Sequence, residues 1–249
     1  MKSLRRLHLH FPTKSPISKP RLRAPPHSPF SSSSSSSSPN SQTSTLTESE
    51  VREINLLIPR LCESNELPTA LRLTTTALLA NPSLHSLSLS PLIHSLTSQP
   101  DLTHTMSLLT HLFHTPLSHP YIHPISLSLL SSYLHNRIPN HALKIFRWLQ
   151  RPLSPCLPDP AIYEVLIPGL CSNGLLLDAL KALGDMLDTH ASSVPSSHSK
   201  DSVYRALLRE ARVNQALEFN AALKSLSTDG EGKERVLLLL QRLVAQFTE

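Results

Sequence analysis

The chain has 249 residues, a formal net charge of +5 at pH 7, and only five glycines and three cysteines. The scarcity of glycine argues against a glycine-rich phosphate-binding loop, and the absence of Cys-x-x-Cys and His-Glu-x-x-His motifs argues against the common zinc sites. The sequence therefore predicts a protein that is not an enzyme and that holds no metal, cofactor or small-molecule substrate.

Residues 1–47 differ in composition from the rest of the chain. They contain seven Lys or Arg, no Asp or Glu, and an unbroken serine run from Ser31 to Ser38. An acid-free start rich in Arg and Ser is typical of an organelle transit peptide, and it is too polar for a secretory signal or a membrane span. We predict a disordered transit peptide for a mitochondrion, with a chloroplast as the alternative; a generic disordered tail is the competing interpretation.

This segment also changes the meaning of the net charge. Without its seven cations, 16 Lys or Arg face 18 Asp or Glu, so residues 48–249 carry a formal charge of −2. Neutralisation of phosphates supplies much of the affinity of RNA-binding proteins. Residues 48–249 are thus expected to bind RNA weakly or with help, unless their cations gather on one face.

Five stretches after residue 47 share one pattern of apolar residues. Each has a hydrophobic pair near its start and a further small or hydrophobic residue three or four places later; the stretches are 56–71, 91–106, 128–143, 165–180 and 206–221. The anchor residues lie 35, 37, 37 and 41 positions apart and are Leu57, Leu92, Leu129, Leu166 and Leu207. A recurrence of this length indicates stacked units of supersecondary structure.

The spacing within a unit is helical. In the fourth unit Ile162, Leu166 and Leu170 share one stripe of a helix, the bend 172–174 follows, and a second stripe begins at Leu176. Asp159 before Pro160 is a typical helix start. The unit is therefore a helix–turn–helix of roughly 35 residues, which buries its apolar faces only against neighbouring units. Pro59 and Pro168 lie inside expected first helices, and we predict a kink at each.

The fourth unit resembles the pentatricopeptide repeat family of plant organelles. The matching residues are Tyr163, Leu166-Ile167, Gly169-Leu170-Cys171, Asn173-Gly174, Asp178-Ala179-Leu180 and Met186. The resemblance covers roughly 48–226 and implies an all-α fold, a right-handed α-solenoid of about five repeats. The alternatives are another helical solenoid and an unrelated helical bundle. The nearest such solenoid is the tetratricopeptide repeat, but its Trp/Gly/Tyr/Ala/Phe/Pro pattern is not visible in this sequence.

The resemblance also implies a function. In this family single-stranded RNA lies along a groove, and side chains of successive repeats contact successive bases. The expected first contact positions, two residues before each anchor, are Asn55, Ser90, Leu127, Glu164 and Arg205. The second positions, just before the next repeat, are His85, Ile122, Asp159 and Lys200. The resemblance implies a protein that acts on organellar transcripts in their processing, stability or translation and that has no membrane partner.

These positions depart from the family's usual pairings. Leu127 has no hydrogen-bonding group, and Glu164 would bring negative charge near phosphates. The alternative function is therefore a short helical scaffold that binds protein subunits of an organellar ribonucleoprotein complex.

The cysteines and histidines suggest no catalytic site. Cys62 and Cys171 occupy equivalent first-helix positions that suit packing, and no base is evident near Cys156 in its Pro-rich connector. The three histidines between 104 and 114 are expected to be exposed polar residues, since the ligand spacing of a zinc site is missing.

The last segment, 232–249, is predicted to be an amphipathic helix that caps the final repeat. Leu237, Leu240, Val244 and Phe247 would face that repeat, and Leu238 and Leu239 widen the apolar arc. A docking or dimerisation strip is the alternative role for this helix.

Overall fold

The computed structural model describes residues 46–80, 86–152, 154–190, 194–225 and 232–247. The chain divides into two units, Met1–Gln42 and Thr43–Glu249, and all described residues belong to the second. They form eleven α-helices and no β-strand, which confirms the predicted all-α class for this part of the chain. The predicted transit peptide falls almost entirely outside the described residues, and so does His85.

Most helices follow one another after short connections. Their bounds are α1 Glu48–Glu63, α2 Leu67–Ala80, α3 Ser90–Thr97, α4 Thr103–His114, α5 His119–His135, α6 Pro139–Leu149, α7 Pro160–Ser172, α8 Leu176–Thr189, α9 Ser197–Arg209, α10 Val213–Ser225 and α11 Gly232–Gln246, with the 3-10 helix η2 at Pro116–Ser118 before α5.

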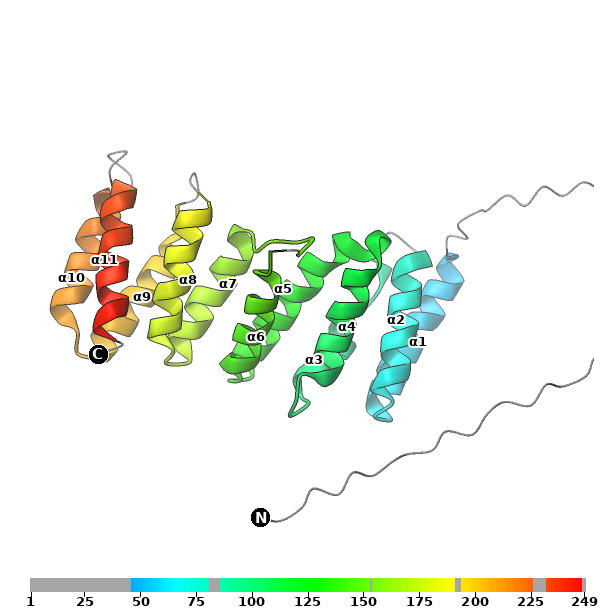
Figure 1. The fold of residues 1–249 in the computed structure, drawn as a ribbon. Helices are drawn as coiled ribbons and strands as arrows, with labels where there is room; N and C mark the ends of the chain where they lie inside the picture. The colour runs from blue at the N-terminus through cyan, green and yellow to red at the C-terminus, as the bar shows by residue number, and fades with distance from the viewer. Residues whose placement is uncertain (1–45, 81–85, 153, 191–193, 226–231, 248–249) are drawn as a thin grey trace, which may run out of the picture. The chain divides into compact units, whose positions relative to one another are not determined.

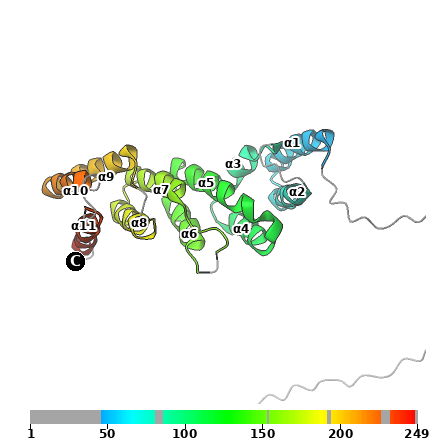
Figure 2. The same cartoon turned by 90° about the horizontal axis from the view of Figure 1, so that it is seen from above.

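Neighbouring helices pack in pairs, and the pairs pack on one another. The helices α1, α5, α7 and α9 each contact the helix that follows, and α3 contacts α4 more sparsely. The first helices also contact each other in sequence, α1 with α3, α3 with α5, α5 with α7 and α7 with α9. Figures 1 and 2 show these first helices in one row and α2, α4, α6 and α8 in a second row. The predicted helix–turn–helix units are therefore present.

Four of the turns within pairs share one hydrogen-bonding pattern. A residue with positive φ donates its N–H to the carbonyl three residues earlier, and the next residue donates to the carbonyl five residues before itself. The positive-φ residues are Asn65, Arg137, Gly174 and Ala211. This pattern ends a helix by satisfying its last carbonyl groups. The bend predicted at 172–174 is confirmed, with Gly174 at φ +78°.

These turns correct the register of the fifth unit. Asn65, Arg137 and Gly174 lie eight residues after Leu57, Leu129 and Leu166, whereas Ala211 lies eight residues after Val203 rather than after Leu207. Val203 is fully buried and lies 37 residues after Leu166, in line with the two intervals before it. The anchor of the fifth unit is thus Val203.

The physical reason for this error is helical periodicity. Val203 and Leu207 are four residues apart, both are buried, and they lie on the same stripe of α9. Apolar spacing alone does not distinguish two positions one turn apart on the same stripe.

The C-terminal helices depart from the pairing of the earlier units. The second helix of the fifth unit, α10, packs against α9 and α11, while α11 packs against α8 and α10. Figure 2 shows α10 continuing the row of first helices and α11 standing next to α8 in the second row. Val236, Leu239, Leu240 and Leu243 of α11 are buried. The helix predicted at 232–249 is present, and it supplies the second-row neighbour of α8.

Close packing joins the central first helices. A Cβ atom on Gly169 of α7 would lie 2.5 Å from Leu134 Cδ1 and 3.0 Å from Leu134 Cβ on α5, so any larger residue at this position would force the Leu134 side chain to move. Tyr133 of α5 is fully buried, and its hydroxyl pairs with Thr105 Oγ1 of α4 at 2.8 Å. These contacts hold neighbouring pairs in a defined register.

Three prolines lie inside continuous first helices. Pro59 and Pro168 occupy α1 and α7 as expected, and Pro124 of α5 is a third that the sequence patterns did not single out. Each removes one backbone donor from the helix interior. The kinks expected at Pro59 and Pro168 stay predictions.

Candidate functional site

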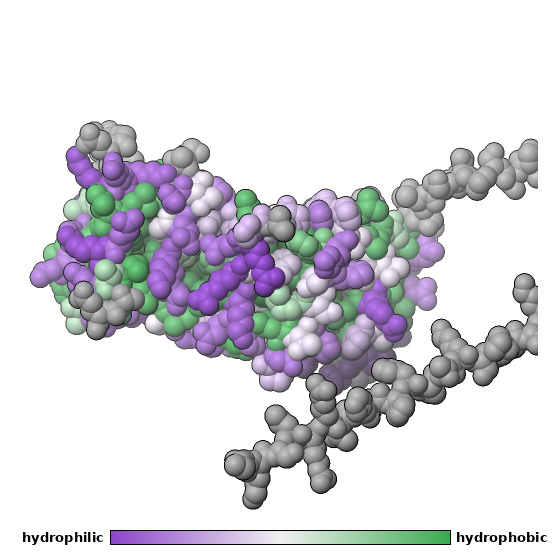
Figure 3. All heavy atoms as spheres, viewed as in Figure 1, coloured by the Kyte–Doolittle hydropathy of each residue, from purple (hydrophilic) through white to green (hydrophobic). Residues whose placement is uncertain are grey.

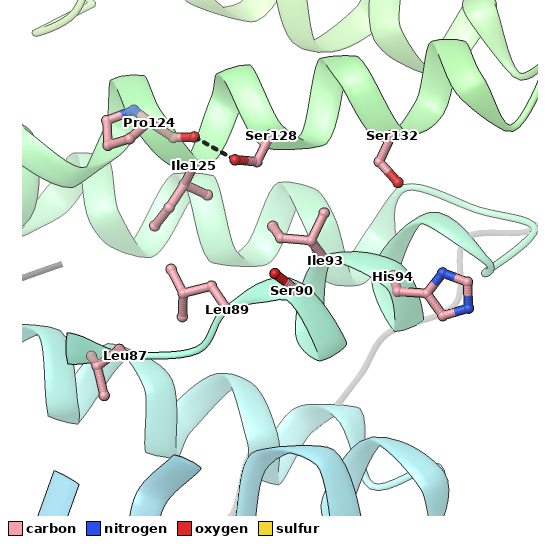
Figure 4. A pocket seen from close by; sticks show the side chains of 9 residues that line it. All are labelled: Leu87, Leu89, Ser90, Ile93, His94, Pro124, Ile125, Ser128 and Ser132. Atoms are coloured by element: carbon pink, nitrogen blue, oxygen red, sulfur yellow. Dashed lines mark hydrogen bonds between the residues drawn. The ribbon is translucent and has the colours of Figure 1, made fainter. Parts of the chain in front are cut away.

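Two cavities lie between consecutive first helices. The first, of about 430 Å³, separates α3 from α5. Figure 4 shows Leu89 and Ile93 pointing from the α3 side toward Ile125 on α5. Ser90 and His94 on α3 line the cavity together with Ser128 and Ser132 on α5. An apolar floor is thus surrounded by hydroxyl and imidazole groups.

The second cavity, of about 500 Å³, lies between α5 and α7 and is continued by one residue of α9. Its polar lining includes Ser131, His135 and Arg137 from the α5 side, Glu164 and Ser172 from α7 and His198 from α9. We call the two cavities together the first-helix grooves. Hydroxyl, imidazole and guanidinium groups offer hydrogen-bond donors and acceptors to a bound chain.

The first predicted contact residue, Asn55, is engaged within the protein. Its Nδ2 donates to the carbonyl of Ser86 at 2.8 Å, and its Oδ1 accepts from the backbone N–H of Ser88 at 2.8 Å. Both partners lie in the connector that leads into α3. Asn55 therefore ties the first pair of helices to the start of the second, and these bonds would have to break before it could contact a ligand.

Glu164, at the equivalent position of the fourth unit, also joins its helix pair to the next one. Its Oε1 accepts from the backbone N–H of Ser196 at 2.7 Å, and its Oε2 accepts from the hydroxyls of Ser196 and of Ser199, the latter at 2.5 Å. Partial burial by itself would raise the pKa of Glu164, but the bonds from the two serines outweigh it and hold the pKa below its ordinary value. Glu164 thus fastens α7 to the first turn of α9.

Asp159 caps a helix and contacts a neighbouring one. Its Oδ1 accepts from the backbone N–H of Ile162 at the start of α7 and lies 2.8 Å from Nε2 of His123 on α5. Burial alone would raise the pKa of Asp159, but the contacts with His123 and Ile162 hold it below its ordinary value. The side chain therefore links α5 to α7.

The remaining predicted positions are placed differently from one another. Ser90 lies in the first groove, Leu127 is half-buried against the apolar core, and Ile122 is fully buried. Arg205 is exposed on α9, and Lys200 lines a separate cavity beside α10. His85 lies outside the described residues.

The corrected register reassigns the positions of the fifth unit. Two residues before Val203 stands Asp201, and seven residues before it stands Ser196. Ser196 caps α9 by accepting from the Ser199 N–H, as Asp159 caps α7. Arg205 and Lys200 are therefore not the equivalents of Glu164 and Asp159.

Several groove residues were missed by the sequence patterns. They are His94, Ser128, Ser132, His135, Arg137 and His198. The sequence did contain a signal for three of them. Ser128, Ser132 and His135 are spaced four and three residues apart, so they share one face of α5. A search for polar stripes beside the anchor Leu129 would have found these three residues.

The three thiols lie in surroundings that disfavour their thiolate form. Burial raises the pKa of the Cys171 thiol to about 12, and burial also raises the pKa of Cys62 and of Cys156. A raised pKa disfavours the thiolate that nucleophilic chemistry needs. Within the described segments, no three His, Cys, Asp or Glu residues come together as metal ligands.

The pKa of Glu164 leads to a test of its structural role. We expect Glu164→Gln to lower the free energy of unfolding by about 1–2 kcal/mol at pH 7, because the bonds to Ser196 and Ser199 weaken. Since the pKa is lower in the folded than in the unfolded state, this stabilisation is complete above the ordinary value of 4.5 and is lost as the pH falls through the folded-state pKa.

Urea unfolding of both proteins from pH 7 down to pH 3 measures this effect. The exposed Glu53→Gln is the matched control and is expected to change stability by less than about 0.5 kcal/mol. An equal loss at every pH would contradict the assignment of the effect to the charge of Glu164.

Comparison with known proteins adds no assignment. No protein-family model matches the chain, and no curated protein is significantly similar to it. No helix of the described segments is both long enough and apolar enough to cross a membrane.

Proposed function

We propose that this chain is a non-enzymatic RNA-binding protein of the pentatricopeptide type, which occupies a single-stranded organellar transcript during its processing, stabilisation or translation. The observation that carries the proposal is the recurrence of one helix pair, with the same turn in four units, which lines up first helices around the grooves. A repeated surface suits an extended ligand better than a compact one. We propose that residues 1–47 target the protein to a mitochondrion, with a chloroplast as the alternative.

The chemistry of the first-helix grooves supports a ligand with bases and phosphates. The half-buried Leu89 offers apolar surface to the face of a base. The hydroxyls of Ser128 and Ser132 already pair with the Pro124 carbonyl and with Thr97 Oγ1, and their oxygens can still accept from a base edge. Arg137, exposed at the second groove, offers a bidentate partner for a phosphate. In the proposed solenoid geometry, the two grooves would present such groups at two successive steps along the RNA.

A groove substitution tests this function. Ser128 is exposed in the first groove, so Ser128→Glu adds a negative charge there without disturbing the core. We expect the full-length variant to bind single-stranded RNA about tenfold more weakly than the parent chain, because like charges repel across an interface. Fluorescence anisotropy with labelled oligonucleotides at low salt measures the affinity.

The control is Ser107→Glu on α4, which is exposed on the second row of helices. It carries the same change in net charge, and it leaves any unspecific attraction of residues 1–47 for RNA unaltered. An equal loss of affinity in both variants would refute binding in the grooves, and so would the absence of binding to any RNA pool below micromolar concentration.

A protein scaffold is the second candidate function. Asn55, Asp159 and Glu164 are engaged in contacts between helix pairs, and residues 48–249 have two more acids than Lys and Arg. Both features favour a protein partner over RNA. Affinity purification from organelles with and without RNase separates the two functions, because a protein partner bound directly would survive the nuclease.

A further inference from the structure

A cavity on the second row of helices differs in character from the first-helix grooves. It has a volume of about 490 Å³ and lies between the C-terminal ends of α4 and α6. Phe113 and Trp148 form its apolar wall, with ring centroids 6.0 Å apart and an angle of 68° between the rings. Pro152 adds further apolar surface, and the exposed His114 and Arg151 complete the wall. We call this cavity the aromatic pocket.

The size and lining of the aromatic pocket suit a large apolar side chain. Ligand pockets in proteins commonly enclose about 300–1,000 Å³ and combine apolar walls with a few polar groups. Trp148 is only 7% exposed, so its ring is held in place by the surrounding side chains. A rigid apolar cavity of this kind binds a side chain with little loss of conformational entropy on the protein side.

One cation, Arg151, lines the aromatic pocket, and two more lie on α6. Lys144 and Arg147 are exposed on one face of α6, and Arg151 follows just after the helix. Figure 3 shows this face of the molecule, with strongly hydrophilic side chains over α6. Arg147 lies 3.7 Å from Asp178 of α8, whereas Arg151 has no acidic partner within the described segments.

The surrounding sequence supplies almost no compensating acid. Residues 67–158 contain five Lys or Arg and a single acid, Asp101, although residues 48–249 as a whole have an excess of acids. Asp101 precedes α4, where its carboxylate accepts from the Thr103 N–H, and the aromatic pocket lies at the other end of this helix. In space, Asp178 and Asp185 of α8 lie against Arg147 of α6 and Gln150 just after it, but neither acid lines the pocket. Among the lining residues Arg151 is charged and none is an acid.

We propose that the aromatic pocket binds an acidic peptide segment of a partner protein, anchored by one aromatic or large aliphatic side chain. The anchor fills the space beside Phe113 and Trp148, and flanking carboxylates pair with Arg151 at the pocket and with Lys144, one helical turn before Trp148 on α6. Buried apolar anchors supply most of the affinity in such interfaces, and charge complementarity supplies specificity and a fast association rate. The proposal does not depend on what the first-helix grooves hold.

A peptide fits this site better than a nucleic acid does. Stacking of bases requires an aromatic ring whose face is open to solvent. Trp148 has its ring largely covered and offers a cavity beside it instead. The cations alone would attract phosphates, but the apolar wall next to them would then stay unused.

The single Trp of the chain makes a direct test possible. The full-length protein is titrated with a short Glu-rich peptide that contains one central Phe and no Trp. We expect a saturable change in the emission of Trp148, and a matching rise in the anisotropy of the fluorescein-labelled peptide. Replacing the peptide's Phe with Ser is expected to weaken binding about tenfold, since the apolar anchor is lost.

Two variants of exposed residues locate the binding site. Arg151→Glu reverses a charge at the pocket, and Thr110→Phe fills the cavity from the exposed side of α4. Each is expected to weaken peptide binding about tenfold. Lys181→Glu on α8 is the matched charge control, because Lys181 is exposed and does not line the pocket, and it is expected to leave the affinity unchanged.

Four results would overturn the proposal. They are an absence of binding up to millimolar peptide, equal binding of the Phe and Ser peptides, equal losses in Arg151→Glu and Lys181→Glu, and displacement of the peptide by single-stranded RNA with the same change in Trp148 emission. The last result would assign the pocket to nucleic acid.

Discussion

Deletion of residues 232–249 is expected to lower the free energy of unfolding by on the order of 5 kcal/mol. Four side chains of α11, namely Val236, Leu239, Leu240 and Leu243, are buried against its neighbours α8 and α10. Burial of one such side chain contributes about 1.5–3 kcal/mol, and the deletion also exposes the apolar surface that they cover. Thermal unfolding followed by circular dichroism compares the full and truncated chains.

A pair of point variants distinguishes packing from other effects of truncation. Leu240 is 2% exposed and Leu238 is 59% exposed on the same helix. We expect Leu240→Ser to cost at least about 3 kcal/mol and Leu238→Ser less than about 1 kcal/mol. Unchanged melting after the deletion would show that α11 only docks on the chain, as in the alternative role considered for this segment.

Contacts of polar side chains also join α11 and the residue after it to α10 and the residue before it. The guanidinium carbon of Arg212 lies 3.8 Å from the ring centroid of Phe247, and Arg242 pairs with Glu218 of α10. Cation–π contacts and exposed ion pairs contribute about 1 kcal/mol or less each. The buried apolar face of α11 thus dominates its expected contribution to stability.

Leu166→Ala is expected to lower the free energy of unfolding by about 2–5 kcal/mol, because the fully buried Leu166 side chain would leave a cavity. Leu57→Ala is expected to cost less than about 1 kcal/mol, although the two leucines hold the same position in the repeat. Leu57 is 38% exposed at the first described helix. Urea unfolding of both variants measures the difference.

A result opposite to the expected one would be informative for either leucine. A loss of several kcal/mol in Leu57→Ala would mean that Leu57 is covered in the folded protein by a partner or by another part of the chain. A small loss in Leu166→Ala would contradict the view that the anchors form the core between helix pairs.

The helix pairs were predictable from the sequence because their signals are local. Apolar residues three and four apart define one stripe of a helix, and an Asn-Gly pair can adopt the backbone conformation that ends it. The turn at Gly174 and the cap at Asp159 were found in this way, and the structure confirms both. Asn65, Arg137 and Ala211 make the same turn with less distinctive residues.

The candidate site was less predictable, because contacts between helix pairs decide which polar side chains are free. Asn55 and Glu164 look like ligand-contacting residues by position, and both are engaged with the segment that begins the next first helix. The groove residues His94 and Ser132 belong to different helix pairs, and only packing of α3 against α5 brings them to one cavity.

Local sequence alone was therefore enough to establish the all-α class, the helix–turn–helix unit and the acid-free composition of residues 1–47, since each depends on neighbours within about ten positions. The tertiary structure decided the register of the fifth unit at Val203, the placement of α11 beside α8, and the aromatic pocket between α4 and α6. These features depend on which buried stripes meet across helix pairs, and helical periodicity does not distinguish positions one turn apart.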